Sequence, residues 1–332
     1  MSKAMPLAVI AVGGNALISD PDHKSITDQS NAAEAASRHI ADIAEKGWNV
    51  VVVHGNGPQV GFILRRSEMA LAEVPAISMD YADADTQGVI GFMFQRALCN
   101  EFHRRKSRRG AIALVTQVLV DQKDPAFDQP TKPIGSHMDE ATARRSGAEQ
   151  GWEVREEPGR GWRRVVASPQ PQKIIELGAI KSLIADEFIV IACGGGGIPV
   201  VEDSDGALSG VEAVIDKDLT SGLLAQALGA EMLIIATEID RVALNFDGPN
   251  PEYLSEMTTS EAKRYCDEGQ FPEGSMGPKI RALIAFVESG TGRGLVTNVA
   301  NLRRAFDGEA GTLLMSDSPT PGGSTRKKQT LQ

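Results

Sequence analysis

The chain has few cysteines, few aromatic residues and no long apolar run. Its 332 residues include three cysteines, and aromatic side chains make up 5%. Because Cys99, Cys193 and Cys266 are odd in number and far apart, they argue against a disulfide framework and indicate reduced, buried thiols in a cytoplasmic protein. The uncharged stretch 188–201 is too short and too rich in glycine to span a bilayer as a helix. We therefore expect no membrane partner.

Basic residues are also fewer than acidic ones. Lysine and arginine number 34 against 44 acidic residues, and the net charge is −10. This balance argues against a nucleic-acid partner, because phosphate backbones attract basic surfaces. One basic cluster, Arg104-Arg105-Lys106 with Arg108-Arg109, follows a stretch of helical apolar period. We interpret it as cations at the carboxyl end of a helix and assign it no function.

Several catalytic signatures are missing. The chain contains no GxxxxGK[ST] P-loop, no HExxH zinc pair, no CxxC, no GxSxG nucleophile elbow and none of the protein-kinase motifs. A dinucleotide oxidoreductase is disfavoured as well, because no GxGxxG follows the first apolar run. What remains is a set of glycine-rich loops and isolated lysines.

Glycine follows three separate apolar runs. The runs 9–12, 50–53 and 188–193 each end in a loop rich in glycine, as a buried strand does before a phosphate-binding turn. Glycine allows positive backbone dihedrals and lets a ligand approach consecutive N–H groups. In an open α/β sheet such loops meet in one crevice at the carboxyl ends of the strands. The candidate phosphate-binding residues are Gly13, Gly14, Asn15, Gly55, Asn56, Gly57, Gly194, Gly195 and Gly196.

Apolar runs of four to seven residues alternate along the chain with stretches of helical period. This pattern predicts an α/β fold, a three-layer sandwich with a largely parallel central sheet covered by helices. We expect helices over 59–69 and 83–106, a helix ending before Gly47, and one buried strand over 111–120. These elements belong to a main domain that we expect to cover 1–315.

Regular patterning stops between 121 and 171. Prolines, charges and scattered aromatics replace the periodic core there, and the segment is too long for an ordinary connection. It is either a small inserted subdomain or a lid, and its composition favours an ordered, turn-rich element. The last residues, 316–332, are expected to form a disordered tail because they are rich in Gly, Pro, Ser, Thr and Lys.

Two lysines lie where helices are expected to start. Lys217 and Asp218 precede a helical stretch with the apolar face Leu219, Leu223, Ala227 and Leu228, and Lys279 precedes the stretch 280–288. The helix dipole disfavours a cation at that end unless a multiply charged anion shares the site. Phosphoryl transfer needs such cations, because it depends on positioning and charge neutralisation. Each lysine taken alone could equally be a solvated surface charge, and Asp218 a carboxylate complementing the dipole.

The motifs together resemble the carbamate kinase family, a branch of the amino acid kinase superfamily, over about 7–314. The Pro-Thr-Lys-Pro-Ile-Gly and Gly-Arg-Gly-Trp-Arg segments in the insertion are specific to that branch, whereas the glycine-rich motifs are shared more widely. The matching segments are Val12–Leu17, His54–Gly61, Thr86–Gly88, Pro130–Gly135, Gly159–Arg163, Cys193–Val201, Gly210–Asp218 and Gly274–Met276 with Lys279.

The resemblance implies reversible phosphoryl transfer between carbamoyl phosphate and Mg²⁺-bound ADP, which gives ATP and carbamate. By this likeness Lys132 reaches carbamoyl phosphate from a protruding subdomain, Lys217 and Lys279 neutralise the transferring group, and Asp218 holds the lysines in position. The resemblance further implies a cytoplasmic homodimer, with arginine catabolism through the arginine deiminase pathway as its setting.

Nucleotide contacts are implied near Thr237, Asp240 and Met276. The segment around Glu238 departs from the Thr-Asp-Val-Asp pattern of relatives, because glutamate replaces an aspartate there. We therefore assign no metal ligand to the protein itself. No general base is expected either, since a phosphate oxygen of ADP is already anionic. His54, near the crevice, is interpreted as a structural hydrogen-bonder at a strand end, with substrate contact as the alternative.

Two other functions remain open. An acetylglutamate-type or other small-acid kinase would use the same loops but would lack the two insertion motifs. A nucleotide-binding sensor without turnover would be expected to have lost one of the three lysines, and Lys132, Lys217 and Lys279 are all present.

Overall fold

Strand β1 (Leu7–Val12) lies at the centre of the molecule, and all six of its residues are buried. Leu7, Val9 and Ala11 belong to one hydrophobic core, and the residues between them belong to a second core on the opposite side of the sheet. Side chains alternate across a strand, so β1 separates two apolar layers. The computed structural model describes residues 5–14, 25–157, 159–246, 248–272, 274–290 and 292–317.

Eight strands of the described chain form the main sheet, which is largely parallel. The order across the sheet is β15-β17-β16-β12-β1-β2-β9-β3, and β16 and β17 pair antiparallel. The β1, β2 and β9 strands are neighbours, which brings together the three predicted glycine-rich loops. The strands are β15 Glu256–Thr258, β17 Thr312–Met315, β16 Arg293–Asn298, β12 Met232–Thr237, β2 Asn49–His54, β9 Ile189–Ile191 and β3 Ala111–Ala113.

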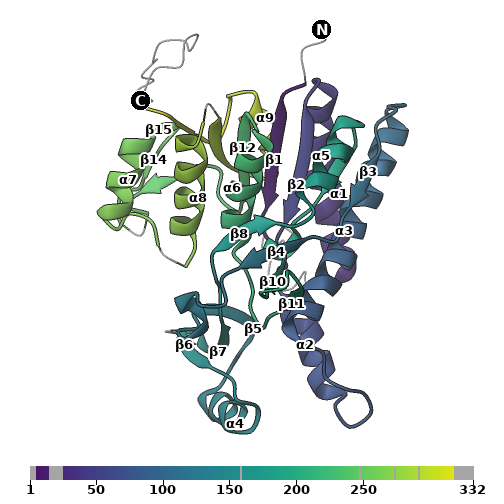
Figure 1. Cartoon of the computed structure of the whole chain (residues 1–332). Coiled ribbons are helices and arrows are strands. Elements are labelled where there is room, and N and C mark those ends of the chain that lie inside the picture. The colour runs from purple at the N-terminus through teal and green to yellow at the C-terminus, as the bar shows by residue number, and fades with distance from the viewer. Residues whose placement is uncertain are drawn as a thin grey trace.

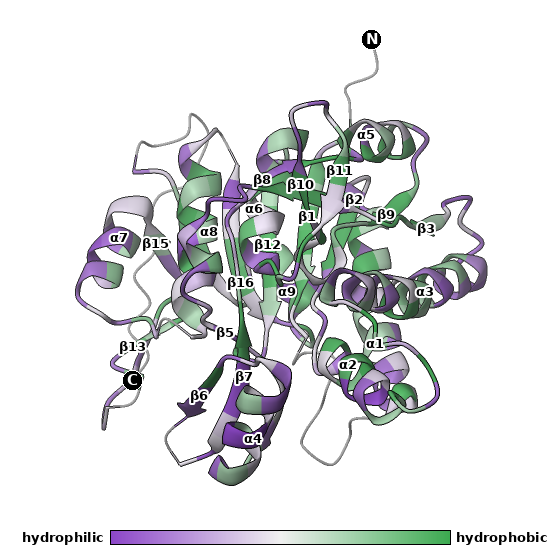
Figure 2. Cartoon of the chain, turned by 60° about the horizontal axis from the view of Figure 1, so that its bottom comes forward, coloured by the Kyte–Doolittle hydropathy of each residue, from purple (hydrophilic) through white to green (hydrophobic). Residues whose placement is uncertain are grey.

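Helices cover both faces of this sheet, which confirms the predicted three-layer α/β sandwich (Figure 1). On one face lie α1 (Ile26–Glu45), α3 (Met79–Arg104) and α9 (Leu302–Phe306). On the other lie α5 (Leu177–Ala185), α6 (Lys217–Leu228) and α8 (Met276–Glu288), with α7 (Thr259–Asp267) beside α8. Figure 2 shows apolar strands inside and polar faces on the outer helices.

A second sheet carries the chain out to the insertion and back. Its order is β11-β10-β4-β8, and β4 (Gln117–Val120) pairs antiparallel with β8 (Pro171–Ile174) on either side of the inserted segment. The remaining strands are β10 (Ile198–Glu202) and β11 (Leu208–Gly210), and a small hairpin joins β13 (Ala243–Leu244) to β14 (Glu252–Tyr253).

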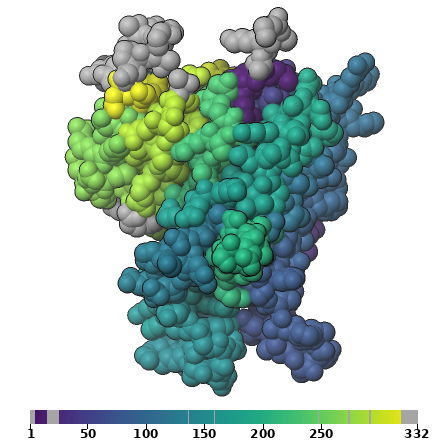
Figure 3. All heavy atoms as spheres, in the orientation of Figure 1, coloured from purple at the N-terminus to yellow at the C-terminus, as the bar shows by residue number. Residues whose placement is uncertain are grey.

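The inserted segment contains its own three-stranded antiparallel sheet and a helix, which project from the body in Figure 1. We call β5 (Lys132–Met138), α4 (Glu140–Gln150), β6 (Val154–Glu157) and β7 (Gly161–Val166) the protruding subdomain. A 3-10 turn at Pro125–Phe127 precedes it. In Figure 3 this subdomain and the end of α2 (Gln59–Met69) form two separate projections below the body.

The expected single strand over 111–120 is wrong. The chain forms β3 in the main sheet and β4 in the second sheet, with a break at Thr116. At the break, the side-chain amide of Gln87 on α3 accepts from the backbone N–H of Thr116 at 2.8 Å and donates to its carbonyl at 3.0 Å. The Thr116 carbonyl also accepts from the backbone N–H of Ile198 in β10 at 2.9 Å, so the chain passes from the main sheet to the second sheet at this residue.

Three smaller expectations also need correction. Cys193 alone of the cysteines is buried, whereas Cys99 is exposed and Cys266 half-buried. Helix α3 begins at Met79, four residues before the expected start. The buried face of α6 includes Gly222, which lies against α8, and Leu224, whereas the expected apolar face is only half-buried at Leu219, Leu223, Ala227 and Leu228. Except for its first two residues, the predicted tail 316–332 lies outside the described residues.

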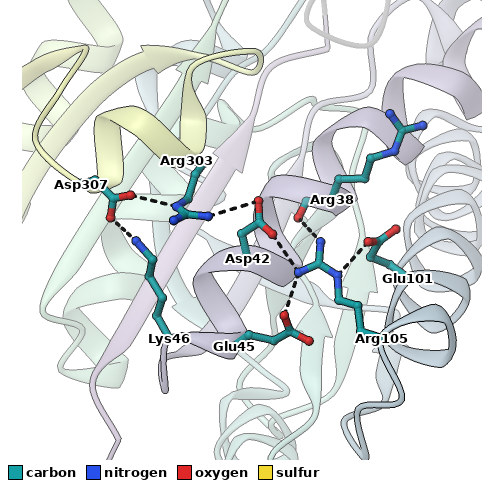
Figure 4. A network of polar contacts seen from close by, with 8 residues as sticks. All are labelled: Arg38, Asp42, Glu45, Lys46, Glu101, Arg105, Arg303 and Asp307. Carbon is teal, nitrogen blue, oxygen red and sulfur yellow. Dashed lines mark hydrogen bonds and ion pairs between the residues drawn. The ribbon is translucent and has the colours of Figure 1, made fainter.

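The basic cluster lies at the carboxyl end of α3, as predicted. Arg105 donates to Asp42 at 2.8 Å and Glu45 at 2.9 Å on α1, and to Glu101 at 2.7 Å on α3 (Figure 4). Asp42 also pairs with Arg303 of α9 at 3.7 Å. This network ties three helices of one layer together.

None of the helices in the described ranges combines the length and apolar composition needed to cross a bilayer.

Candidate active site

A cavity of about 1200 Å³ lies where the ends of β1, β2 and β12 meet the starts of α6 and α8, and β5 of the protruding subdomain lies along it. We call it the main cavity. Twelve of the predicted site residues line it: Gly13, Gly14, Gly55, Asn56, Gly57, Lys132, Gly195, Lys217, Asp218, Thr237, Met276 and Lys279. Of the other predicted residues, Gly194, Gly196 and Asp240 do not line it, and Asn15 lies outside the described residues.

The first two glycine loops pack backbone against backbone. A methyl group placed on Gly14 would overlap the backbone of Gly57, and one placed on Gly55 would lie 2.7 Å from the backbone nitrogen of Gly14. Gly57 also has a positive φ of 53°. The sequence uses glycine here because no side chain fits between the loops. The two loops therefore form one rigid wall of the main cavity.

The third glycine loop serves mainly as packing for the first two. Cys193 and the glycines Gly195, Gly196 and Gly197 have positive φ values, which lets the backbone turn tightly after β9. A methyl group on Gly194 would overlap the ring of His54, and one on Gly195 would overlap the side chain of Asn56. Only Gly195 of this loop lines the main cavity. The loop is thus close to the predicted crevice, but most of it faces the protein.

The structure supports the structural interpretation of His54. The residue is fully buried at the end of β2, its Nδ1 lies 3.2 Å from the carbonyl oxygen of Gly55, and its ring stacks on Phe94 with centroids 6.3 Å apart. Burial lowers the pKa of His54 to about 4, so the ring is neutral at physiological pH. His54 supports the glycine loops from below and does not line the main cavity.

Asn56 is held by a buried polar network. Its Nδ2 donates to Asp83 at 2.9 Å, and its Oδ1 accepts from the Thr86 hydroxyl at 2.7 Å. Burial raises the pKa of Asp83 well above its usual range. Both partners lie on α3, so this helix sets the orientation of an amide that lines the main cavity.

Lys217, Asp218 and Lys279 meet at the starts of two helices. Asp218 is buried, forms an ion pair with its neighbour Lys217, and accepts from Lys279 at 3.0 Å. Burial alone would raise the pKa of Asp218, but the charges of Lys217 and Lys279 outweigh it and lower the pKa. Burial lowers the pKa of Lys217, and the adjacent carboxylate opposes that shift. One carboxylate thus holds two ammonium groups at the cavity wall.

Asp216 is a site residue that sequence reasoning missed. Its Oδ1 accepts from the backbone N–H of Asp218 at 2.9 Å and so caps α6, while its Oδ2 accepts from Lys132 of the protruding subdomain at 2.6 Å. Burial opposes ionisation, but the charge of Lys132 lowers the pKa of Asp216. An aspartate directly before a helix is a recognisable capping signal, but its contact with Lys132 joins residues 84 apart.

The opposite end of the main cavity is mostly apolar. Thr237 is the last residue of β12 and lies there, and the neighbouring lining residues include Ile239, Ala243, Phe246, Phe271, Pro272 and Met276. Asp240 instead accepts from Asn301 at 2.8 Å and Thr297 at 3.3 Å, so it joins the loop after β12 to the end of β16. An apolar slot beside a cationic end suits a ligand with a flat base and phosphates.

No resident metal centre is evident in the described part of the chain. No group of three or more His, Cys, Asp or Glu side chains there could hold a metal ion. Of the three carboxylates that line the main cavity, Asp216 and Asp218 are paired with lysines, and Glu238 is exposed after β12. A divalent ion would therefore find its oxygen ligands mainly on a bound phosphate ligand.

Comparison with known proteins gives consistent likenesses. The amino acid kinase family model matches residues 6–298. Carbamate kinase from Pyrococcus furiosus is 43% identical over 309 residues, covering 92% of this chain and 98% of that protein. Carbamate kinase from Clostridium perfringens is 43% identical over 311 residues, covering 92% and 99%. The structure of carbamate kinase from Giardia lamblia bound to AMP-PNP superposes with a TM-score of 0.88 at 38% identity, covering 95% of this chain and 99% of that one.

Proposed function

Because this chain belongs to the carbamate kinase family, within the amino acid kinases, and is therefore a phosphotransferase, we propose that it transfers a phosphoryl group between carbamoyl phosphate and ADP. The products are ATP and carbamate, which breaks down to ammonia and carbon dioxide. The observation that carries the proposal is the convergence of Lys132, Lys217 and Lys279, from three separate elements, on one cavity lined by glycine backbone.

The reaction needs charge neutralisation more than covalent chemistry. An oxygen of the ADP β-phosphate attacks phosphorus, the bond between phosphorus and the carbamoyl oxygen breaks, and the electron pair leaves with carbamate. Lys217 and Lys279 donate hydrogen bonds to the oxygens of the moving group, and Asp218 keeps both ammonium groups in place. No protein base is required, since the attacking oxygen is already anionic.

The protruding subdomain supplies the third cation. Lys132 is the first residue of β5, and its contact with Asp216 fixes it at the mouth of the main cavity. We assign Lys132 to carbamoyl phosphate, with Gly13, Gly14, Gly55, Asn56 and Gly57 framing the same end. The contact joins the subdomain to the cap of α6, so Lys132 is presented only when the subdomain is docked.

ADP fits the apolar end, with its base near Phe246 and Met276 and its phosphates toward the lysines. Mg²⁺ would arrive with the nucleotide and supply Lewis-acid neutralisation of its phosphates, because the buried end of the cavity offers only Asp216 and Asp218, which are paired with lysines. The carbamate kinase of Giardia lamblia bound to the ATP analogue AMP-PNP supports a nucleotide ligand here. Thr237 belongs to this proposal, whereas Asp240 faces Asn301 instead.

A homodimer is part of the same proposal. Tyr81, Val89 and Phe92 lie along one side of α3 with exposed fractions of 68%, 41% and 56%, and Val115 beside the edge strand β3 is 57% exposed. Apolar side chains gathered in this way usually belong to an interface. A cytoplasmic location and a role in arginine catabolism complete the proposal, on the strength of the family likeness alone.

The decisive experiment follows ATP formation from carbamoyl phosphate and Mg²⁺-bound ADP with luciferase, because carbamoyl phosphate also decays unaided. Lys279→Ala should lower kcat by roughly 100-fold, about 3 kcal/mol, as expected when one preorganised donor to the transition state is lost. Lys263→Ala is the matched control, because Lys263 on α7 pairs with Glu288 away from the cavity.

ATP that requires both substrates, with loss in Lys279→Ala and not in Lys263→Ala, would establish the activity. A Lys279→Ala variant that retains more than half of kcat would remove the assigned role of that lysine. Folded wild-type protein that makes no ATP would favour another small-acid kinase or a nucleotide sensor.

A further inference from the structure

A second cavity of about 250 Å³ lies between α2 and the protruding subdomain. It is separate from the lysines of the main cavity, although Phe62, Ile134, Gly135 and His137 line both. Its wall on the subdomain side also includes Arg164 of β7 and Trp152, which precedes β6. The cavity therefore adjoins β5, the strand that carries Lys132.

Arg164 presents an uncompensated charge in this cavity. The residue is half-buried, and its guanidinium makes no hydrogen bond or ion pair with any part of the chain that the structure describes. The guanidinium lies over the ring of Trp152, 4.8 Å from the centroid, where the ring face attracts the cation. Burial lowers the pKa of Arg164, as expected for a cation that lacks a contacting carboxylate.

The other ionisable side chains around the second cavity already have partners. Arg65 contacts Glu68 at 3.3 Å on α2, and His137 contacts Glu157 at 2.8 Å within the subdomain. Glu212 and Glu68 lower the energy of the Arg164 charge only from a distance. One positive charge is thus left over, which suits a monoanion.

The rest of the lining is largely apolar and limits the size of a ligand. Its apolar members are Phe62, Leu64, Ile134, Met138 and Trp152. An apolar protein cavity of roughly 150 Å³ holds a benzene molecule. The second cavity, about 250 Å³, therefore has room for a ring or branched chain of that size together with one carboxyl group.

We propose that the second cavity is a binding site for a small organic monocarboxylic acid. The carboxylate pairs with the planar guanidinium of Arg164, which matches it in a two-point hydrogen-bonded fork. The apolar body of the acid packs against Trp152 and the side chains of α2. Inorganic phosphate fits less well, because it would leave its remaining charged oxygens against apolar side chains.

The test uses benzoate as the probe and benzamide as its neutral isostere, with binding to the full chain measured by isothermal titration calorimetry. We expect wild-type protein to bind benzoate, and Arg164→Gln and benzamide each to weaken binding at least about tenfold. Arg155→Gln should bind as wild type does, because Arg155 is exposed on β6 of the same small sheet.

The variant Lys279→Ala distinguishes benzoate binding in the second cavity from benzoate binding in the main cavity. Benzoate binding that persists in Lys279→Ala and is lost in Arg164→Gln supports the second cavity, whereas loss in Lys279→Ala would place the probe in the main cavity and overturn the proposal. Equal binding by Arg164→Gln, or no wild-type binding at about 20 mM benzoate, would overturn it as well. If Arg164→Gln does not fold, the wild type tests the proposal, because it should bind benzoate at least about tenfold more tightly than benzamide. Turnover is not measured, so this result is independent of the proposed activity.

Discussion

Two aspartates, two residues apart, organise the lysines of the main cavity. Asp218 holds Lys217 and Lys279, and Asp216 holds Lys132. The sequence could indicate the three lysines and Asp218 because local helix starts and family motifs mark them. It could not indicate the second role of Asp216, since the partner is fixed by how the subdomain docks.

For a similar reason Gly194 and Gly196 were predicted to bind phosphate, although their conformations serve contacts with His54 and Ile215.

His54 should make the stability of the protein depend on pH in a predictable direction. Its pKa is about 4 in the folded protein and about 6.5 when unfolded, so the unfolded chain binds more protons between these values. Stability is therefore lost as pH falls from about 6.5 towards 4, by about 3 kcal/mol in total from this residue.

Urea unfolding of wild type and His54→Gln at pH 7 and pH 5 measures this effect. The variant should lose less stability than the wild type over that interval. The raised pKa of Asp83 makes stability depend on pH in the opposite direction. Because Asp83 is present in both proteins, its contribution cancels in the comparison. An identical pH dependence in the two proteins would contradict the assignment of a neutral, buried ring.

The helices differ in how well local sequence predicts them. Helix α2 spans Gln59–Met69 as predicted, because a proline before it and a polar end after it are local signals. The break between β3 and β4 was missed, because Gln87 is 29 residues from Thr116 and no local pattern reveals the contact. The basic cluster after α3 was located correctly, but its partners on α1 come from packing.

Arg105 should contribute to stability by joining α1 to α3 (Figure 4). Replacing it with methionine keeps most of the apolar stem and removes four hydrogen bonds, three of them to carboxylates on α1 and α3. We expect Arg105→Met to lower the free energy of unfolding by about 2 kcal/mol.

Chemical denaturation measures this loss, and Arg108→Met is the control because Arg108 is exposed three residues later. The control should change stability by less than about 0.5 kcal/mol. Equal effects of the two substitutions would show that general charge, and not the Arg105 network, is responsible.

At the scale of the whole molecule, the main sheet ends at β3, whose edge lies beside the exposed apolar side of α3. An open strand edge and an apolar helix face are both features that proteins usually cover. The fold itself follows from alternating apolar runs and was predicted correctly. The face that a second copy would cover was not, because Tyr81, Val89 and Phe92 look like core residues until α3 is placed on the sheet.

Phe92→Glu should shift the protein from dimer to monomer, because a charge would be buried at the centre of the proposed interface. Size-exclusion chromatography with light scattering measures the molar mass over a range of concentrations. Tyr253→Glu is the control, because Tyr253 on β14 is similarly exposed, at 58%, on a different part of the surface. A dimer that persists in Phe92→Glu, or one that is lost equally in the control, would exclude this face.

The wall of the main cavity is backbone at one end and side chains at the other, and this difference affects how the sequence of the protein can diverge. At the glycine end the wall is backbone, and any side chain added to Gly14 or Gly55 overlaps a neighbouring loop. At the other end the wall is made of exchangeable side chains such as Ile239, Phe246 and Met276. Inherited variation, or a laboratory library, can therefore change which ligand the side-chain end accepts, while the glycine end, where we propose that the phosphoryl group binds, stays the same.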